Sequence, residues 1–294
     1  MVFLLLFILG LFIGSFLNVL SLRYEEGKTI LGWHIARGRS HCMKCKEDLR
    51  WFELIPLLSF LMQRGRCRHC FHIISWQYPI VETITGLITA FIPLFFYSFF
   101  HVQQAVLQGQ PYEWFYIFSG LWLITAYTLI TASVIDFRLK IIPDQSNVLL
   151  AVLGIAILTV KYSYGKFFPY QGSFSSFYTE IFGAQSTVSM NVIFAILLAL
   201  AIFGGIILFS KGRGMGMGDL KLAIAMAFLL SWPDVIIAYS AAFIIGGAIG
   251  LLLLARQTKK FKDSIPFGPY LAIGIFIAIF YAEPLLKWYF SLVQ

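Results

Sequence analysis

Long apolar segments dominate this sequence and restrict it to one class of fold. A helix needs about 20 apolar residues to cross the roughly 30 Å hydrocarbon core of a bilayer. The segments here are continuously apolar rather than alternating, which predicts helices and argues against a membrane β-barrel. Eight candidates occur, the fourth and sixth of them short: residues 2–22, 79–100, 114–136, 147–161, 190–210, 219–232, 235–255 and 267–290.

The composition agrees with a membrane protein. Of the 294 residues, 59% are hydrophobic and only 12% are charged, and the mean hydropathy is +0.82. These values lie outside the range of soluble globular domains. We therefore expect an all-α polytopic membrane protein with about eight transmembrane helices. Residues 1–22 lack a basic n-region and a small-x-small cleavage site, so we expect a retained helix rather than a signal peptide.

The basic residues predict the orientation of these segments. If successive loops alternate between the two sides, one side receives 18 of the 22 Lys and Arg residues. The positive-inside rule then places the basic loops in the cytoplasm and both termini outside. This topology accounts for the net charge of +8, with anionic lipid headgroups as a sufficient partner, so we do not expect nucleic acid as a partner. The basic loops are residues 23–78, 137–146, 211–218 and 256–266.

The one sizeable polar region, residues 23–78, contains all four cysteines. Cys42 with Cys45, and Cys67 with Cys70, form two C-x-x-C knuckles separated by 21 residues. Four thiolates match the tetrahedral coordination of a structural zinc ion, and such a closed site leaves no position for catalysis. Two disulfides are an alternative that a reducing cytoplasm disfavours. Thiol redox chemistry is another, but its usual βαβ context is absent.

The rest of this insertion is expected to form its surface. His41, His69 and His72 flank the knuckles, and with four cysteines present we expect them to be solvated neighbours rather than ligands. Residues 53–63 are apolar but only about 11 residues long, which suits an interfacial or packed helix. Basic residues such as Arg64 are expected to be solvated or to face lipid.

Two aspartates fall at the same predicted membrane depth, near the cytoplasmic face. Asp136 ends the third apolar segment, and Asp219 starts the sixth, where Gly216 and Gly218 precede it. An ionisable group next to hydrocarbon is costly, so its default interpretation is functional, with a partner nearby. Two adjacent carboxyls share one proton, which suits peptide hydrolysis because the ionised member activates water while the protonated member polarises the carbonyl. Glycines allow an extended substrate to approach closely.

Other interpretations of these residues stay open. Asp219 can be a helix N-cap, and Asp136 can pair with Arg138 or Lys140. Asp144 follows a proline at the start of the next helix, so we expect it to be a cap that can also support the aspartates. A proton- or cation-coupled transporter and a non-enzymatic zinc-bearing subunit of a secretion apparatus are rival functions. Transport sites usually lie near the bilayer midplane, which disfavours the first rival.

Taken together, the motifs resemble the bacterial type IV prepilin leader peptidases, which belong to the G-x-G-D intramembrane aspartyl proteases. The resemblance runs through most of the chain, and the order and spacing of the motifs make it specific. The matching residues are Gly14-Ser15-Phe16-Leu17-Asn18-Val19 with Arg23, Ser40-His41-Cys42 with Cys45, Ile55-Pro56-Leu57-Leu58-Ser59, residues 64–70, Ile74-Ser75-Trp76 with Tyr78-Pro79 and Glu82, Asp136, Ile142-Pro143-Asp144, Gly216-x-Gly218-Asp219-x-Lys221-Leu222, and Ile265-Pro266-Phe267-Gly268-Pro269.

The resemblance implies a membrane aspartic endopeptidase in the bacterial inner membrane. Its catalytic pair is Asp136 and Asp219. Supporting roles fall to residues of the same motifs: Gly216, Gly218, Asp144 and Lys221. Family members cut the basic leader from prepilins or pseudopilins at the cytoplasmic face, in type IV pilus assembly or protein secretion.

Many family members also methylate the new N-terminal amine with S-adenosylmethionine, and four cysteines favour this zinc-bearing, bifunctional type. The methyl transfer rests on resemblance alone, because the sequence shows no Gly-rich fingerprint of a soluble S-adenosylmethionine fold. The expected organisation is a transmembrane helix at 1–22, a zinc-binding insertion at 23–78 and a protease core at 79–294. Residues 162–189 match no family motif, and we expect a connector packed on the surface.

Overall fold

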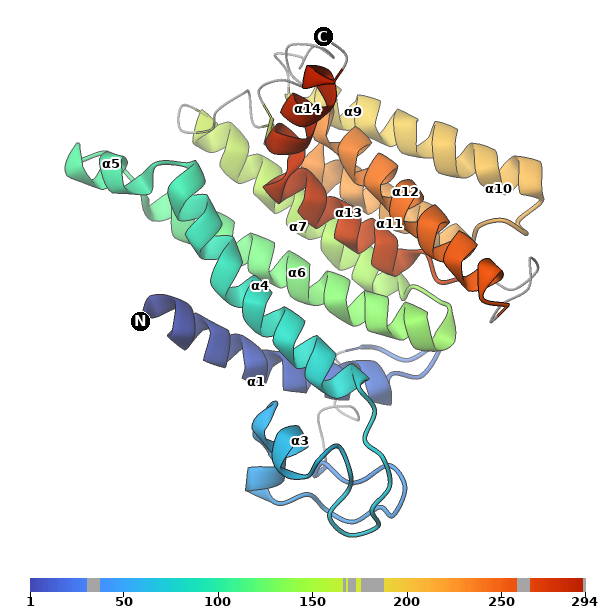
Figure 1. Ribbon diagram of the computed structural model, residues 1–294. Coiled ribbons are helices and arrows are strands. Elements are labelled where there is room, and N and C mark those ends of the chain that lie inside the picture. Colours follow the sequence, from blue (N-terminus) through green and yellow to red (C-terminus); the bar gives the residue numbers. More distant parts are fainter. Residues whose placement is uncertain (31–37, 166–167, 169–172, 176–187, 258–264, 293–294) are drawn as a thin grey trace. The chain divides into compact units, whose positions relative to one another are not determined.

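The computed structural model describes residues 1–30, 38–165, 168, 173–175, 188–257 and 265–292 (Figure 1). Regular structure within these ranges is helical, with two isolated β-bridges. The all-α fold expected from the sequence is therefore confirmed. The chain forms two compact units, Met1–Phe96 and Tyr97–Gln294.

The first unit contains α1 (Val2–Arg23), most of the antiparallel helix α4 (Gln77–Phe99), and the cysteine-bearing insertion between them (Figure 1). The two helices pack almost backbone to backbone, since a Cβ atom added to Gly10 would lie 2.7 Å from Cα of Gly86. Near the insertion, the fully buried Asn18 donates a hydrogen bond from Nδ2 to the Tyr78 carbonyl at 3.3 Å.

The insertion carries a 3-10 helix at Trp51–Leu54 and the short helix α3 at Leu58–Met62. The single helix expected over residues 53–63 is therefore interrupted. Pro56 cannot donate to a helical ladder, and Leu57 adopts a left-handed φ of +59° that ends any continuous helix there.

The second unit is a helical bundle with α11 at its centre. This helix contacts α7, α9, α12 and α13 and buries Leu222, Met226 and Leu230 among them. A π-helical turn at Leu200–Gly204 joins α9 to α10. The helices of this unit are α5 (Val102–Leu107), α6 (Glu113–Leu139), α7 (Asp144–Ser163), α9 (Val188–Ala199), α10 (Gly205–Ser210), α11 (Met217–Leu230), α12 (Asp234–Ala255), α13 (Gly268–Phe280) and α14 (Ala282–Ser291).

All eight apolar segments are helical, but not every one of them forms a straight helix long enough to cross a membrane. Among the described residues, six helices are long and apolar enough to cross a membrane; the bent pair α13 and α14, which meet at 79°, can make a seventh. α7 begins at Asp144 and reaches 20 residues, longer than its apolar run suggested. α11 has only 14 residues, about 21 Å of helix. Because other helices enclose it, α11 need not match the bilayer thickness.

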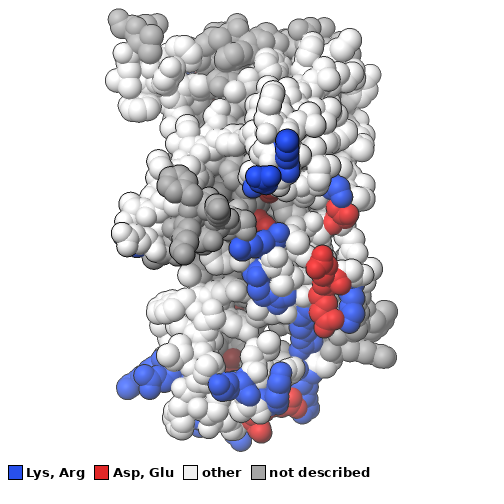
Figure 2. Space-filling view, turned by 90° about the vertical axis from the view of Figure 1, so that its right-hand side faces the viewer, with Lys and Arg blue, Asp and Glu red and all other residues white. Residues whose placement is uncertain are grey.

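The surface of the helices suits a lipid environment. Large apolar side chains such as Leu4, Phe12 and Phe16 of α1 are about half exposed, and the face drawn in Figure 2 has wide areas without any Lys, Arg, Asp or Glu. In water such a surface would be an aggregation hazard. In hydrocarbon it is the expected exterior of a membrane helix.

Candidate functional site

Asp136 lies in the last turn of α6 and is almost completely buried. Its Oδ2 atom accepts a hydrogen bond of 2.9 Å from the backbone N–H of Gly268, the first residue of α13. α6 ends three residues later, at Leu139, where Lys140 adopts the left-handed conformation. The start of α13 thus fixes the orientation of a carboxyl group at the end of α6.

Asp219 lies in the first turn of α11, where Gly216 is the N-cap residue. Its Oδ2 atom accepts a hydrogen bond of 3.2 Å from the Gly216 N–H. This is the helix-capping role that the sequence left open, although Asp219 is the third helical residue and not the cap itself. The bond holds the partly buried carboxyl group in place.

The structure brings the two aspartates together. The Asp136 and Asp219 carboxyl groups are close enough to interact electrostatically. Ile142, between α6 and α7, packs against the backbone next to Asp219 and against the backbone that binds Asp136. A Cβ atom on Gly218 would lie 3.4 Å from Cβ of Ile142, and one on Gly268 would lie 3.2 Å from Cδ1 of Ile142. Packing of α6, α7, α11 and α13 therefore builds one site from residues far apart in the chain.

Asp144 and Lys221, for which the sequence predicted supporting roles, form an ion pair at the edge of this site. Lys221 of α11 donates a hydrogen bond of 2.7 Å to Oδ1 of Asp144, the first residue of α7. Both side chains are substantially exposed. Asp144 does not cap its helix as expected, because Pro143 occupies the cap position. The ion pair instead ties α7 to α11 beside the aspartates.

Gly268 is a site residue to which sequence reasoning gave no role. It belongs to a motif that contributed to the family resemblance, yet nothing local marks its N–H as a partner of Asp136. A Cβ atom at this position would lie 2.8 Å from Oδ2 of Asp136. Only a residue without a side chain leaves room for this carboxyl.

The four cysteines form a second site, in the first unit. The Sγ atoms of Cys42, Cys45, Cys67 and Cys70 all lie within 4.8 Å of one another, and those of Cys42 and Cys70 are 3.9 Å apart. Tetrahedral coordination with metal–sulfur bonds of about 2.3 Å requires sulfur–sulfur distances near about 3.8 Å. All four are free thiols, so the disulfide alternative does not apply. The cluster can bind a metal ion.

The two knuckles have the same backbone structure. In the first, Cys42 N donates to Glu47 O at 2.9 Å, and the second repeats this bond from Cys67 N to His72 O at 2.8 Å. The residue after the second cysteine is left-handed in each, with φ of +61° at Lys46 and +55° at Phe71. Each chain reversal thereby turns two thiols toward a common point.

At Cys42 the surroundings favour the thiolate form that a metal requires. Burial disfavours the charged form of Cys42, but hydrogen bonds from the backbone of Cys45 and Lys44, together with the neighbouring thiols, lower the pKa of Cys42 to about 7. A lowered thiol pKa increases the fraction available as ligand at neutral pH.

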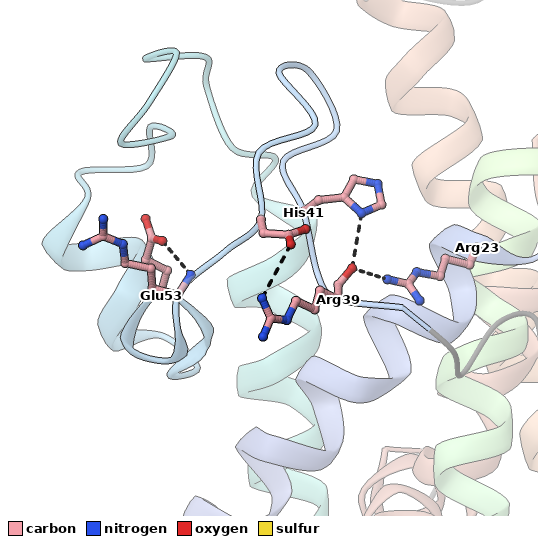
Figure 3. Close-up of polar contacts among 6 residues, drawn as sticks. Arg23, Arg39, His41 and Glu53 are labelled. Atoms are coloured by element: carbon pink, nitrogen blue, oxygen red, sulfur yellow. Dashed lines mark hydrogen bonds and ion pairs between the residues drawn. The ribbon is translucent and has the colours of Figure 1, made fainter.

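Polar contacts attach the first knuckle to α1 (Figure 3). Nη2 of Arg23, the last residue of α1, donates to the Arg39 carbonyl at 3.1 Å, and Nδ1 of His41 lies 3.3 Å from the same oxygen. His41 is thus a neighbour of the cysteines and not a ligand. His69 and His72 are exposed, as expected for solvated neighbours.

A buried polar cluster lies where a surface connector was expected. Most of residues 162–189 lies outside the described residues, but Phe168 and residues 173–175 are buried. Both oxygens of the fully buried Asp234 accept hydrogen bonds, from Ser173 Oγ at 2.5 Å and from Phe174 N at 2.9 Å. Lys161 Nζ lies 4.8 Å from the centre of the Phe174 ring. This part of the connector belongs to the interior of the second unit.

Comparison with known proteins identifies the family. The family model described as the bacterial peptidase A24 N-terminal domain matches residues 8–96, and the model of the type IV leader peptidase family matches residues 123–251. The chain belongs to the type IV leader peptidase family. The second match contains both aspartates, and the first contains all four cysteines.

Relatives named prepilin leader peptidase/N-methyltransferase align with nearly the whole chain of this leader peptidase family member. The protein of Aeromonas hydrophila is 28% identical, with 98% of this chain and 94% of the relative covered. The Pseudomonas aeruginosa protein is 26% identical, with 96% of this chain and 91% of the relative covered. The Legionella pneumophila protein is 27% identical, with 96% of this chain and 93% of the relative covered. No solved structure matches the chain.

Proposed function

We propose that this protein is a membrane-embedded aspartic endopeptidase that removes the basic leader from type IV prepilins or pseudopilins and methylates the new N-terminal amine. The family and its bifunctional relatives support both activities. The single observation that carries the peptidase role is the meeting of Asp136 and Asp219, 83 residues apart in the chain, at adjoining helix ends.

In the proposed mechanism the two carboxyl groups share one proton. The ionised member removes a proton from the attacking water, while the protonated member donates a hydrogen bond to the scissile carbonyl oxygen. The Gly268 and Gly216 N–H groups each hold one carboxyl oxygen in position. Such preorientation lowers the barrier because little reorganisation is needed when the substrate arrives.

Gly216 and Gly218 suit the approach of a substrate backbone. Gly216 and its neighbour Met217 are exposed next to Asp219, and without Cβ atoms the two glycines leave the space beside the carboxyl open. The Asp144–Lys221 pair keeps the start of α11 attached to α7. We assign these four residues supporting roles and the two aspartates the catalytic roles.

For the metal we propose structural zinc. Four thiolates at tetrahedral spacing favour zinc among the common metals, and a site closed by four protein ligands stabilises its fold without taking part in chemistry. S-adenosylmethionine would supply the methyl group for the transferase activity. The zinc would hold the insertion of residues 23–78 in a defined shape for that activity.

We place the insertion and both aspartates on the cytoplasmic side of the inner membrane, with the termini outside. The distribution of Lys and Arg over the loops supports this orientation. A substrate with a soluble basic leader and an apolar helix would then present the junction between them at the depth of the aspartates. Residues 79–294 would form the protease core, in contact with membrane lipids.

The transporter alternative is not favoured. Its sites usually lie near the bilayer midplane, whereas Asp136 and Asp219 both lie within a turn of a helix end. The family match also names a peptidase.

The decisive experiment uses purified full-length protein and a synthetic prepilin in lipid nanodiscs. Asp136→Asn and Asp219→Asn should each lower the cleavage rate by at least about 100-fold, the usual contribution of a positioned acid or base. Glu113→Gln is the matched control, because Glu113 is exposed in the first turn of the same helix as Asp136. If both asparagine variants cleave at the wild-type rate, the assignment of this pair is wrong.

A further inference from the structure

The insertion exposes an apolar face around α3. Leu58, Leu61 and Met62 stand at positions i, i+3 and i+4 and therefore on one side of the helix; Leu61 is 68% and Met62 78% exposed. A second exposed apolar ring lies beside α3: Trp76 is 68% exposed, and its ring is 5.1 Å from that of Phe60. A water-soluble insertion would not gather such residues on its outside.

Hydrogen bonds fix the level of α3 along the membrane helices. The N–H of Leu57, the residue before α3, donates to Oε2 of Glu82 at 2.9 Å. Glu82 is five residues beyond the start of α4, about 7 Å along the helix. The same carboxyl accepts a hydrogen bond from Ser15 of α1, eight residues before the helix ends at Arg23, about 12 Å.

Leu57 therefore sits alongside α1 and α4 rather than beyond their ends. The contact between the two helices supports this level, since a Cβ atom on Gly14 would lie 2.8 Å from Cα of Glu82. Both helices are long and apolar enough to span a membrane. α3 consequently begins at a depth that the outer part of one lipid leaflet occupies, and amphipathic interfacial helices bury their apolar face about 5 to 10 Å into that region.

The charges near α3 suit the same location. Arg64, Arg66 and Arg68 follow the helix and are exposed, and Arg68 lies over the ring of Phe52 at 5.5 Å. An apolar face next to exposed guanidinium groups matches acyl chains next to anionic phosphates. The same charges would repel a basic leader peptide, which argues against the substrate leader as the occupant.

We propose that α3 and Trp76 form a membrane-dipping segment that inserts into the leaflet in which α1 and α4 meet the insertion, with Arg64, Arg66 and Arg68 at the level of the lipid phosphates. The occupant of the exposed face is thus lipid, and the four cysteines are held at the membrane surface. The hydrogen bond from the Leu57 N–H to Glu82 sets the depth of α3 in the leaflet. The proposal does not depend on peptidase activity.

Photo-crosslinking to lipid tests this directly. Benzoylphenylalanine is placed at Leu61 or Met62 of the full-length protein, reconstituted in nanodiscs of phosphatidylethanolamine and phosphatidylglycerol, and lipid adducts are measured by mass spectrometry. We expect at least about tenfold more adduct than with the same group at Lys44, an exposed knuckle residue. Equal yields at the two sites, or adducts only to protein, including a second copy of this chain, would overturn the proposal.

A second measurement avoids unnatural residues. Lipids brominated on the acyl chain near the headgroup quench tryptophan fluorescence at short range, so they should quench Trp76, and Trp76→Phe should remove that part of the quenching. Glu82→Ala should reduce it as well, whereas Glu82→Gln, whose carbonyl oxygen can still accept the Leu57 N–H, should preserve it. Quenching that stays unchanged in Trp76→Phe would contradict the membrane-dipping position.

Discussion

At the scale of single residues, the contact between Gly268 and Asp136 is the most sensitive point of the candidate active site. The N–H of Gly268 holds one carboxyl oxygen, and a Cβ atom there would lie 2.8 Å from that oxygen. We predict that Gly268→Ala lowers the cleavage rate by about 10- to 100-fold, because a displacement of about 1 Å at a reacting group can cost that much. Prepilin cleavage under single-turnover conditions measures the effect.

The control for this substitution lies on the helix that carries Asp136. A Cβ atom added to Gly120 of α6 would have no atom within 4 Å, so Gly120→Ala should cleave at the wild-type rate. A Gly268→Ala protein with full activity would show that the orientation of the Asp136 carboxyl is not critical.

At the scale of elements, close helix contacts hold the second unit together. At the crossing of α12 and α13, a Cβ atom on Gly274 would overlap the carbonyl oxygen of Ala238. We predict that Gly274→Ala lowers the free energy of unfolding by about 1 to 3 kcal/mol, the usual cost of overpacking. The melting temperature in detergent should fall accordingly.

Gly247 of α12 provides the comparison for that packing effect. No atom lies within 4 Å of a Cβ built on it, so Gly247→Ala should leave the melting temperature unchanged or raise it, because alanine favours helix by up to about 1 kcal/mol. Equal losses in both variants would indicate a general intolerance to alanine rather than a specific contact.

Hydrogen bonds also attach the buried residues 173–175 to two helices, α12 and α14. Asp234, in the first turn of α12, accepts hydrogen bonds from Ser173 and Phe174, and Ser175 Oγ donates to Glu283 of α14 at 2.8 Å. Polar groups buried with their partners cost little, whereas removing one partner leaves the others without theirs. These bonds explain why residues 173–175, part of an aromatic, Ser-rich segment, are buried inside the second unit.

At the scale of the whole molecule, the cysteines and the aspartates belong to different compact units, Met1–Phe96 and Tyr97–Gln294. We predict that removing the metal, by chelation or with Cys42→Ser and Cys67→Ser together, unfolds the knuckles and abolishes methyl transfer. Prepilin cleavage should persist, because α6, α7, α11 and α13 build the aspartate site without the cysteines. Metal analysis, proteolysis of the insertion and both activity assays measure this.

Acid should have the same effect as chelation. Metal binding requires thiolates, so protons compete with the metal as the pH falls, and the metal content should decrease while neutral and alkaline buffer retain it. About one metal equivalent per chain is expected at neutral pH, since one four-thiolate site holds one ion. A folded, metal-free chain at neutral pH would contradict the site.

Several features of this protein follow from short stretches of sequence. The apolar segments have to be helices because every backbone polar group in hydrocarbon needs an internal partner. Two C-x-x-C knuckles determine a metal-ligand set because the ligands lie a few residues apart. The glycines and Asp219 start a helix through bonds between neighbours. In each case the deciding interaction is local.

Other features were decided only by tertiary structure. The meeting of Asp136 with Asp219, the Gly268 N–H, the enclosure of the short α11 and the level at which Glu82 holds Leu57 all join residues far apart in the chain. Such contacts depend on which helix faces pack together, which no local pattern records. The sequence by itself therefore determined the class of protein and the chemistry of its side chains, while packing decided which of those side chains act together.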